Sequence, residues 1–259
     1  MPKNERLREI VEILKKEDFA SVSDISKLLY VSQPTVRRDL NILERQGVIR
    51  RNHGGAVLCE NEISSPVSFR KKKRSKQKSA ICRMAATFIE QGTVIFADAS
   101  STALHLCEYI KPSDDLTVVT NGLPLFNALV GEGINVILTG GSFIENSQAF
   151  VGGVAKKAIS AFNAELMFFS SSALGADGMI SDYSEMETEL RTTMTERSRK
   201  KVFLCDGTKF DRSSPYCLIP ISGVDYIVTD TPLDENIISQ NDLILVSSDQ
   251  ESYLYSKNK

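Results

Sequence analysis

The sequence lacks the features that mark several classes of protein. It has no apolar run of membrane-spanning length. Its first residues, M-P-K-N-E-R-L-R-E, lack the hydrophobic region of a secretion signal. The cysteines are odd in number and form no C-x-x-C pair, so neither a disulfide framework nor a zinc site is indicated; they are Cys59, Cys82, Cys107, Cys205 and Cys217. We therefore expect a cytoplasmic protein with reduced thiols, no membrane association, no metal and no cofactor.

Charge is divided unevenly along the 259 residues, whose net charge is -2. Residues 1–78 carry 18 Lys and Arg against 10 Asp and Glu, a net of +8, whereas residues 79–259 carry 13 against 23, a net of -10. A basic N-terminal part suits attraction to a phosphate backbone, and an acidic remainder discourages DNA from binding elsewhere. The length allows one small and one medium domain, each with its own core.

The first 45 residues predict three short helices. Residues 7–14 carry apolar side chains at i, i+3, i+4 and i+7, the spacing of an amphipathic helix. The segment S-V-S-D-I-S-K-L-L, residues 21–29, places a hydroxyl cap at Ser21 or Ser23 before a second helix. A short turn at residues 30–32 leads into a third helix, which begins near Pro34. Three compact helices with a tight turn before the third predict a helix-turn-helix.

The third helix and the segment after it carry the candidate DNA contacts. Val36, Leu40 and Leu43 share one helical face, which leaves the other faces polar. Residues 48–57, V-I-R-R-N-H-G-G-A-V, have two β-type segments around a glycine pair, as in a winged hairpin. The candidates for contact with double-stranded operator DNA are Ser32, Gln33, Thr35, Arg37, Arg38, Asn41, Arg50, Arg51 and His53. Which of them read bases is left open, and the two helix arginines also fit a solvated face.

A connector is expected after the hairpin, so the predicted organisation is residues 1–58 for DNA binding, 59–75 for a linker and 76–259 for the second domain. Within residues 70–78, seven of nine residues are Lys or Arg. This run either adds non-specific affinity for the duplex or forms the solvated start of the next helix.

Residues 79–259 predict a mostly parallel α/β sheet. Short continuous apolar runs alternate with helical stretches, and continuous hydrophobicity indicates strands covered on both faces. The predicted strands are 93–97, 116–119, 136–138, 166–169, 202–205, 226–228 and 243–246, and the predicted helices are 101–110, 122–131, 153–162, 185–199 and 233–240. The fold class is therefore α/β, with a small winged helix-turn-helix in front.

Small and hydrogen-bonding residues follow the predicted strands, where ligands bind in open parallel sheets. The segment D-A-S-S-T, residues 98–102, supplies three hydroxyls at an expected helix start, which suits an anion such as a phosphate. Gly140, Gly141, Gly152 and Gly153 allow a ligand to approach the backbone closely. Asp206 could accept bonds from sugar hydroxyls. Structural alternatives remain, because serines also cap helices and glycine pairs usually make turns.

Two sets of motifs resemble one protein family. T-V-R-R-D-L, then L-E-R-Q-G-V-I-R-R-N-H-G-G-A, resembles the winged helix-turn-helix of the DeoR family of bacterial transcriptional regulators, over most of residues 5–58. The segments I-F-A-D-A-S-S-T, L-T-V-V-T-N, V-I-L-T-G-G, F-V-G-G and L-C-D-G-T-K-F are similar to that family's effector-sensing domain, over about residues 76–232. In the family this domain is related to ribose-5-phosphate isomerase and CoA-transferases and binds phosphorylated sugars.

The resemblance implies which residues bind the effector. The candidates are Asp98, Ser100, Ser101, Thr102, Asn121, Gly140, Gly141, Glu187, Asp206 and Lys209, to which the strand-end argument adds Gly152. The family often has Gly where Ser100 stands and Ser-Lys where this chain has Thr208-Lys209, so the identity of the sugar is left open.

Two functions fit these features. The first is a homo-oligomeric repressor of carbohydrate-metabolism genes that is not an enzyme and is controlled by a phosphorylated sugar. The second is a sugar-phosphate isomerase with a DNA-binding appendage, because acid/base residues such as Asp98, Glu187, Asp206 and Lys209 are present. An isomerase needs a base within hydrogen-bond reach of a substrate proton, and nothing in the sequence fixes that geometry.

Overall fold

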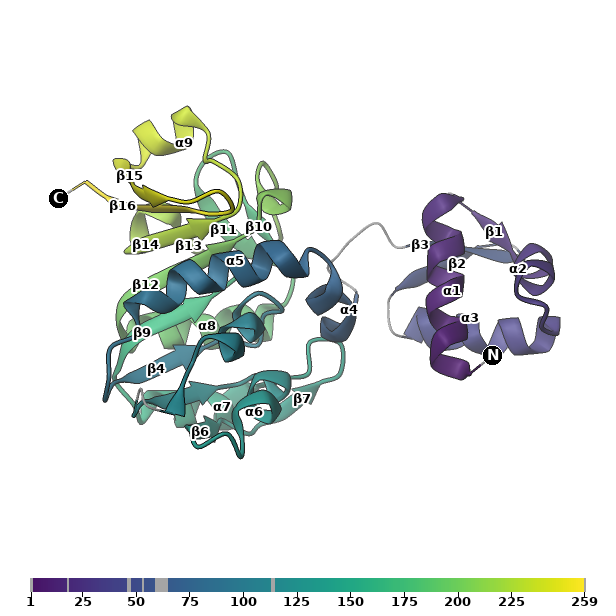
Figure 1. Ribbon diagram of the computed structural model, residues 1–259, viewed down its shortest axis with the longest axis horizontal. Coiled ribbons are helices and arrows are strands. Elements are labelled where there is room, and N and C mark those ends of the chain that lie inside the picture. Colours follow the sequence, from purple (N-terminus) through teal and green to yellow (C-terminus); the bar gives the residue numbers. More distant parts are fainter. Residues whose placement is uncertain are drawn as a thin grey trace. The chain divides into compact units, whose positions relative to one another are not determined.

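The computed structural model describes residues 2–17, 19–45, 48–52, 54–58, 65–112 and 115–258. The chain divides into two compact units, Met1–Arg70 and Lys71–Lys259 (Figure 1). Each unit has its own hydrophobic core. Of the candidate DNA contacts and cysteines named above, His53 and Cys59 lie outside the described ranges, as does most of the first part of the expected linker, residues 59–64. Helix α4 (Val67–Lys72) falls within the segment expected as a linker. No helix in the described ranges combines the length and apolar character needed to span a membrane.

The first unit contains the three predicted helices and the predicted hairpin. Its elements are α1 (Lys3–Lys16), β1 (Ala20–Ser21), α2 (Val22–Leu29), α3 (Gln33–Arg45), β2 (Ile49–Asn52) and β3 (Gly55–Leu58). Ser21 caps α2 by accepting a hydrogen bond from the Asp24 backbone N–H, as one of the two expected hydroxyls. Val36 and Leu40 on α3 are fully buried, which confirms the predicted inner face of that helix.

The hairpin depends on two glycines with different roles. Gly54 lies in the turn between β2 and β3 with φ +78°, a conformation that other residues adopt at a cost. Gly55 pairs with Ser21 of β1, and a Cβ at Gly55 would lie 2.3 Å from the Ala20 carbonyl oxygen. The small third strand, which the sequence did not predict, therefore needs a residue without a side chain at this position.

An eight-stranded sheet forms the centre of the second unit, in the order β15-β16-β14-β12-β9-β4-β5-β6. The strands are β4 (Val94–Ala97), β5 (Thr117–Thr120), β6 (Asn135–Leu138), β9 (Ala164–Phe169), β12 (Ser198–Cys205), β14 (Tyr226–Thr229), β15 (Leu243–Ser248) and β16 (Tyr253–Lys257). Pairings from β14 through β6 are parallel, and those involving β16 are antiparallel. The predicted mostly parallel α/β class is confirmed.

Helices cover both faces of this sheet (Figure 1). On one face α5 (Ser75–Ala85), the 3-10 helix η3 (Ala103–Glu108) and α6 (Leu123–Leu129) contribute to one core. On the other face α7 (Gly152–Ser160), α8 (Glu185–Glu196) and α9 (Glu235–Gln240) contribute to a second core. Phe168 belongs to the first core and Phe169 to the second, since successive side chains of a strand point to opposite faces.

Several predicted elements differ from the structure. The helix expected at 101–110 is the short 3-10 helix η3, and the helix expected at 185–199 ends at Glu196. The run 243–246 is a strand, but most of its side chains are exposed because it forms one edge of the sheet. Six strands in the described part of the second unit were not predicted: β7 (Ser142–Ile144), β8 (Ala149–Val151), β10 (Ala173–Leu174), β11 (Met179–Asp182), β13 (Tyr216–Pro220) and β16.

Candidate functional site

Helix α3 presents an exposed polar face opposite its buried one. Ser32, Gln33, Arg37, Arg38 and Asn41 are exposed, and Thr35 is half-buried. Ser32 precedes the helix. Its Oγ accepts a hydrogen bond from the Thr35 backbone N–H at 3.4 Å and shares a second hydrogen bond with Thr35 Oγ1 at 2.9 Å, so Ser32 also caps the helix. The Arg37 and Arg38 side chains make no hydrogen bond or ion pair with the described part of the chain. Their donors are available to an anionic partner.

Two contacts fix the position of α3 and the hairpin. The Arg6 guanidinium of α1 donates two hydrogen bonds to the Asp39 carboxylate, which is buried, and this pairing raises the pKa of Arg6. Asp39 is thus a structural residue within the R-R-D-L motif. The Arg51 guanidinium of β2 donates to Asn41 Oδ1 at 2.6 Å, which joins two of the predicted DNA contacts. The side chain of Arg50 is not described.

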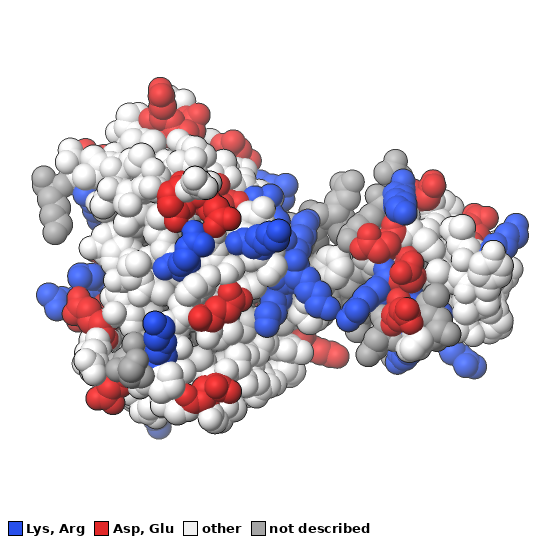
Figure 2. All heavy atoms as spheres, in the orientation of Figure 1, with Lys and Arg blue, Asp and Glu red and all other residues white. Residues whose placement is uncertain are grey.

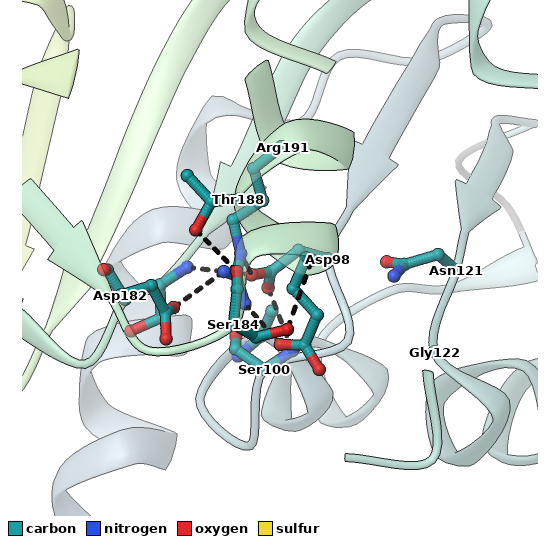
Figure 3. Close-up of polar contacts among 12 residues, drawn as sticks. Asp98, Ser100, Asn121, Gly122, Asp182, Ser184, Thr188 and Arg191 are labelled. Atoms are coloured by element: carbon teal, nitrogen blue, oxygen red, sulfur yellow. Dashed lines mark hydrogen bonds and ion pairs between the residues drawn. The ribbon is translucent and has the colours of Figure 1, made fainter. Parts of the chain in front are cut away.

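In the second unit, Arg191 of α8 joins three carboxylates at the end of the sheet (Figure 3). Its Nε donates to Asp98 Oδ2 and its Nη1 to Asp182 Oδ2, each at 2.7 Å. Its Nη2 donates to Glu187 Oε2 at 3.3 Å. The Arg191 side chain is only 7% exposed, so the sheet end holds a buried cation among acids.

Charge pairing sets the protonation of this cluster. Burial disfavours the charged form of Asp182, but the Arg191 charge and hydrogen bonds from Ser172 and Tyr183 outweigh it, so the pKa of Asp182 lies below its usual value. Burial likewise disfavours the charged Arg191, and the three carboxylates outweigh it and raise its pKa. Asp182 and Arg191 are therefore charged at neutral pH.

A second cluster lies two strands away, at the end of β12. Lys209 Nζ donates to Ser170 Oγ at 2.7 Å and lies 3.7 Å from Asp206 Oδ2. Asp206 is buried, which disfavours its charged form, but Lys209, a Thr208 hydrogen bond and Lys78 together hold its pKa below the usual value. Ser170 also donates a backbone hydrogen bond to Asp98, at 3.4 Å, and so connects the two clusters.

The hydroxyls at residues 100–102 have separate roles. Ser100 Oγ accepts a hydrogen bond from the backbone N–H of Ala103, the first residue of η3, so this hydroxyl stabilises the turn that leads into the helix. Ser101 Oγ accepts a hydrogen bond from the buried Lys78 Nζ at 3.2 Å. Thr102 Oγ1 is buried and finds no hydrogen-bond partner among the described residues. The helix that follows these hydroxyls is the 3-10 helix η3 and not the longer helix expected at 101–110.

The remaining candidates lie after the strands β5 and β6 and at the start of α7. Asn121 Nδ2 donates to the Phe150 carbonyl, whereas its buried Oδ1 has no hydrogen-bond partner in the described ranges. Figure 3 places Asn121 and Gly122 to one side of the Arg191 cluster. Gly140, Gly141 and Gly152 all have positive φ. A Cβ at Gly141 would lie 2.5 Å from the Val151 carbonyl oxygen, so this glycine is needed for packing whether or not a ligand binds.

The basic run 70–78 divides into exposed and inward-facing residues. Figure 2 shows Lys and Arg gathered over α4 and the start of α5. Lys71, Lys72, Lys73 and Lys76 are exposed, whereas Lys78 is buried. Arg74 turns inward and pairs with Asp230 and Asp206. Sequence periodicity did not separate these two sets.

A hollow of about 530 Å³ lies at the opposite end of the sheet, at the amino ends of β4, β9 and β12. Three of its charged residues already have partners: Arg199 contacts Glu165 at 3.1 Å, and Arg197 donates to the Ser160 carbonyl. The carboxyl ends of the strands, where Arg191 and Lys209 converge, remain the better candidate because their polar groups include an unpaired acceptor and an unpaired hydroxyl.

Sequence reasoning missed three cations that pair with or donate to residues at the strand ends, namely Arg191, Lys78 and Arg74. A signal for Arg191 was present: it lies four residues after Glu187 and between Leu190 and Met194, on the helical face that becomes buried. A charged residue on an apolar face indicates a buried ion pair. For Lys78 and Arg74 the surrounding lysines concealed any such pattern.

Two family models match the chain. The model of the DeoR-like helix-turn-helix domain matches residues 6–62, and that of the DeoR C terminal sensor domain matches residues 73–231.

Similar proteins carry regulator names. The HTH-type transcriptional regulator GolR of Listeria innocua is 34% identical over 233 residues, 89% of this chain and 92% of that protein. The glycerol-3-phosphate regulon repressor of Escherichia coli K12 is 30% identical over 233 residues, 90% and 92% of the two chains. The L-fucose operon activator of Haemophilus influenzae is 31% identical over 242 residues, 92% and 97%.

Among solved structures, ribose 5-phosphate isomerase A of Methanocaldococcus jannaschii has a TM-score of 0.38 and 10% identity, over 52% of this chain and 54% of that one. A likeness at this level does not bear on function.

Proposed function

Because the chain belongs to the DeoR family of DNA-binding transcriptional regulators, we propose that it represses carbohydrate-metabolism genes under the control of a phosphorylated sugar. The sugar binds at the carboxyl end of the sheet in the second unit, and α3 with its hairpin binds operator DNA. The names of two relatives, the glycerol-3-phosphate regulon repressor and the L-fucose operon activator, support the assignment to carbohydrate metabolism.

One observation carries the sensor proposal: cations, carboxylates and unsatisfied polar atoms converge where the parallel strands end. Lys209 supplies a positive charge for a phosphate, and Asn121 Oδ1 and Thr102 Oγ1 are buried polar atoms that sugar hydroxyls would satisfy. Such convergence of polar groups at strand ends is the usual setting of a ligand site in open α/β sheets.

The DNA proposal rests on the exposed arginines of α3. Arg37 and Arg38 present their guanidinium groups on the face opposite the buried Val36 and Leu40. The early turns of this helix enter the major groove in helix-turn-helix proteins, and the hairpin then lies along the phosphates. Because such proteins generally bind two half-sites, the active form is a homo-oligomer.

Control follows from unequal affinities. A phosphosugar that binds more tightly to the conformation unable to bind DNA increases the population of that conformation. The size of the shift is limited by the difference between the phosphosugar's affinities for the two conformations. Repression then ends when the sugar phosphate accumulates.

The isomerase alternative is disfavoured by how the acids are bonded. Asp98 accepts hydrogen bonds from Arg191 and from the backbone N–H groups of Ser100 and Ser170, which leaves it poorly placed to accept a substrate proton. Asp206 is bonded to Thr208, and its lowered pKa makes it a weak base. We therefore assign binding rather than catalysis to these carboxylates.

One experiment separates the two functions. The full chain is incubated with ribose 5-phosphate, glucose 6-phosphate, fructose 6-phosphate and glycerol 3-phosphate, and both product formation and the melting temperature are recorded. The sensor proposal predicts a raised melting temperature with at least one compound and no turnover. Turnover of any compound would support the isomerase, and no shift with the panel and its close analogues would remove the sensor proposal.

A further inference from the structure

Arg74 connects the start of the second unit to the strand ends. It lies four residues beyond Arg70, the last residue of the first unit, and it is the residue before helix α5. Its Nη2 donates to Asp230 Oδ2, and its Nε lies 3.7 Å from Asp206 Oδ1. The Asp206 and Asp230 side chains are 2% and 4% exposed, so Arg74 pairs with two buried acids that follow β12 and β14.

Asp206 is shared between this contact and the candidate ligand site. Its other oxygen, Oδ2, faces Lys209 at 3.7 Å, and Lys209 in turn bonds Ser170. One turn along α5, Lys78 donates to Ser101 Oγ. Helix α5 therefore reaches the proposed site twice, through residues that lie at its beginning and on its buried side.

The Arg74 contact is only partly satisfied. Its Nε is buried but has no hydrogen-bond partner among the described residues, because 3.7 Å is too long for a hydrogen bond. Its backbone has φ 54°, in the left-handed region that residues other than glycine adopt at a cost. An unsatisfied donor on a strained backbone is held in place mainly by the two carboxylates.

We propose that Arg74 is the positioning residue through which occupancy of the ligand site reaches the DNA-binding unit. This inference rests on the function proposed above. An anionic group bound beside Lys209 competes with Asp206 for that lysine, which frees Asp206 to pair more closely with Arg74. The start of α5 then moves, and the chain carries the change into the first unit through the residues just before it.

The test uses full-length chains and a DNA duplex that the wild-type chain selects from a random-sequence pool. Arg74→Gln removes the cation, and Asp230→Asn weakens the same contact without touching Lys209. Arg83→Gln is the matched control, since Arg83 is also on α5 and also pairs with two acids, Asp249 and Glu251, but at an exposed site. Each chain is titrated on the duplex with and without ribose 5-phosphate, glucose 6-phosphate, fructose 6-phosphate and glycerol 3-phosphate, and its melting shift with each compound is recorded.

Wild type and Arg83→Gln should both lose DNA affinity with the compound that raises their melting temperature, by a factor within the usual range for coupled sites of about 5- to 150-fold. Arg74→Gln and Asp230→Asn should keep the melting shift and the DNA affinity of the unliganded chain, but their DNA affinity should no longer change with the compound. A purely structural role for Arg74 would instead alter the unliganded DNA affinity or the melting shift.

Three results would overturn the inference. First, the compound could lower the DNA affinity of both variants as it does for wild type. Second, the compound could fail to raise the melting temperature of both variants, which would make Arg74 a ligand contact. If Arg74→Gln does not fold, Asp230→Asn decides alone. Third, the wild-type chain could select no DNA sequence, or no compound could change its DNA affinity. Either outcome would contradict the proposed function itself, and the Arg74 inference with it.

Discussion

Arg191 Nε donates to Asp98 Oδ2 across 2.7 Å and so joins helix α8 to the end of strand β4, although the two residues are 93 positions apart in the sequence. Both side chains are almost completely buried. A buried ion pair is tolerated when the remaining polar atoms are also bonded, and here Asp182, Glu187 and the Ser100 and Ser170 backbones supply those bonds. The pair therefore fixes the shape of the candidate ligand site before any ligand arrives.

Replacing Arg191 should destabilise the second unit strongly. Arg191→Met leaves Asp98 and Asp182 buried without their cation, which typically costs about 3–5 kcal/mol. The free energy of unfolding from urea titration of the full chain measures the loss. Arg199→Met is the control, because Arg199 is 74% exposed and its pair with Glu165 is worth no more than about 1 kcal/mol. Equal effects of the two substitutions would contradict the structural role of the buried cluster.

Stability of the second unit should fall in acid because of Asp182 and Asp206. The pKa of each is lower in the folded chain than its ordinary value, so folding is favoured while they are ionised. This contribution is complete above the unfolded pKa of about 3.9 and is lost as pH falls through the folded value. Urea midpoints should therefore be flat between about pH 7 and 5 and fall below about pH 4. Asp182→Asn should make that decline shallower, and an unchanged decline would contradict the assignment.

Most strands of the main sheet could be predicted from the sequence because they are short continuous apolar runs. Phe168 and Phe169, for example, lie in an unbroken apolar run and pack into opposite cores. Strands with mixed residues, such as β16 with its sequence Y-L-Y-S-K, were missed although β16 lies within the main sheet. The residue pattern of the helix-turn-helix was equally clear, since Val36, Leu40 and Leu43 recur at helical spacing.

Less of the candidate site could be predicted. The strand-end rule pointed to Asp98, Asp206 and Lys209 because they follow buried strands, and the structure brings them near Ser170. The partners of these residues come from α8 and α5, far away in the sequence. Which arginine would pair with Asp98 depends on how helices pack over the sheet, and no local pattern determines that.

Arg38→Ala should weaken DNA binding without altering the response to a sugar phosphate. Arg38 is exposed on α3. If Arg38 contacts a base, its loss costs about 1–3 kcal/mol of binding free energy. If it contacts a phosphate, its loss reduces the slope of log affinity against log salt concentration by about one. Fluorescence anisotropy on the selected duplex at several salt concentrations distinguishes the two. Arg8→Ala on α1 removes the same charge from another exposed position and should have little effect. A normal affinity for Arg38→Ala would refute the assignment of the recognition helix.

Gly55→Ala should disrupt the hairpin more than Gly54→Ala. A methyl group at Gly55 collides with the Ala20 carbonyl, so β1 and β3 must separate. At Gly54 there is open space, and alanine meets only the left-handed backbone, a strain of about 1–3 kcal/mol. Hydrogen exchange should show lost protection of β1 and β3 amides in Gly55→Ala. Should the two substitutions have the same effect, or Gly54→Ala the larger one, the proposed role of Gly55 is wrong.

The central claim is that a phosphosugar bound at the carboxyl end of the sheet controls the affinity of the chain for operator DNA. Its most direct test is the affinity of wild type and Lys209→Met for the selected duplex, measured with and without the sugar phosphate that raises the wild-type melting temperature. We predict that the compound weakens wild-type binding by about 5- to 150-fold. Lys209→Met should bind DNA as tightly as wild type and show no response to the compound. A Lys209→Met chain released from DNA at the same sugar phosphate concentration as wild type would contradict the account.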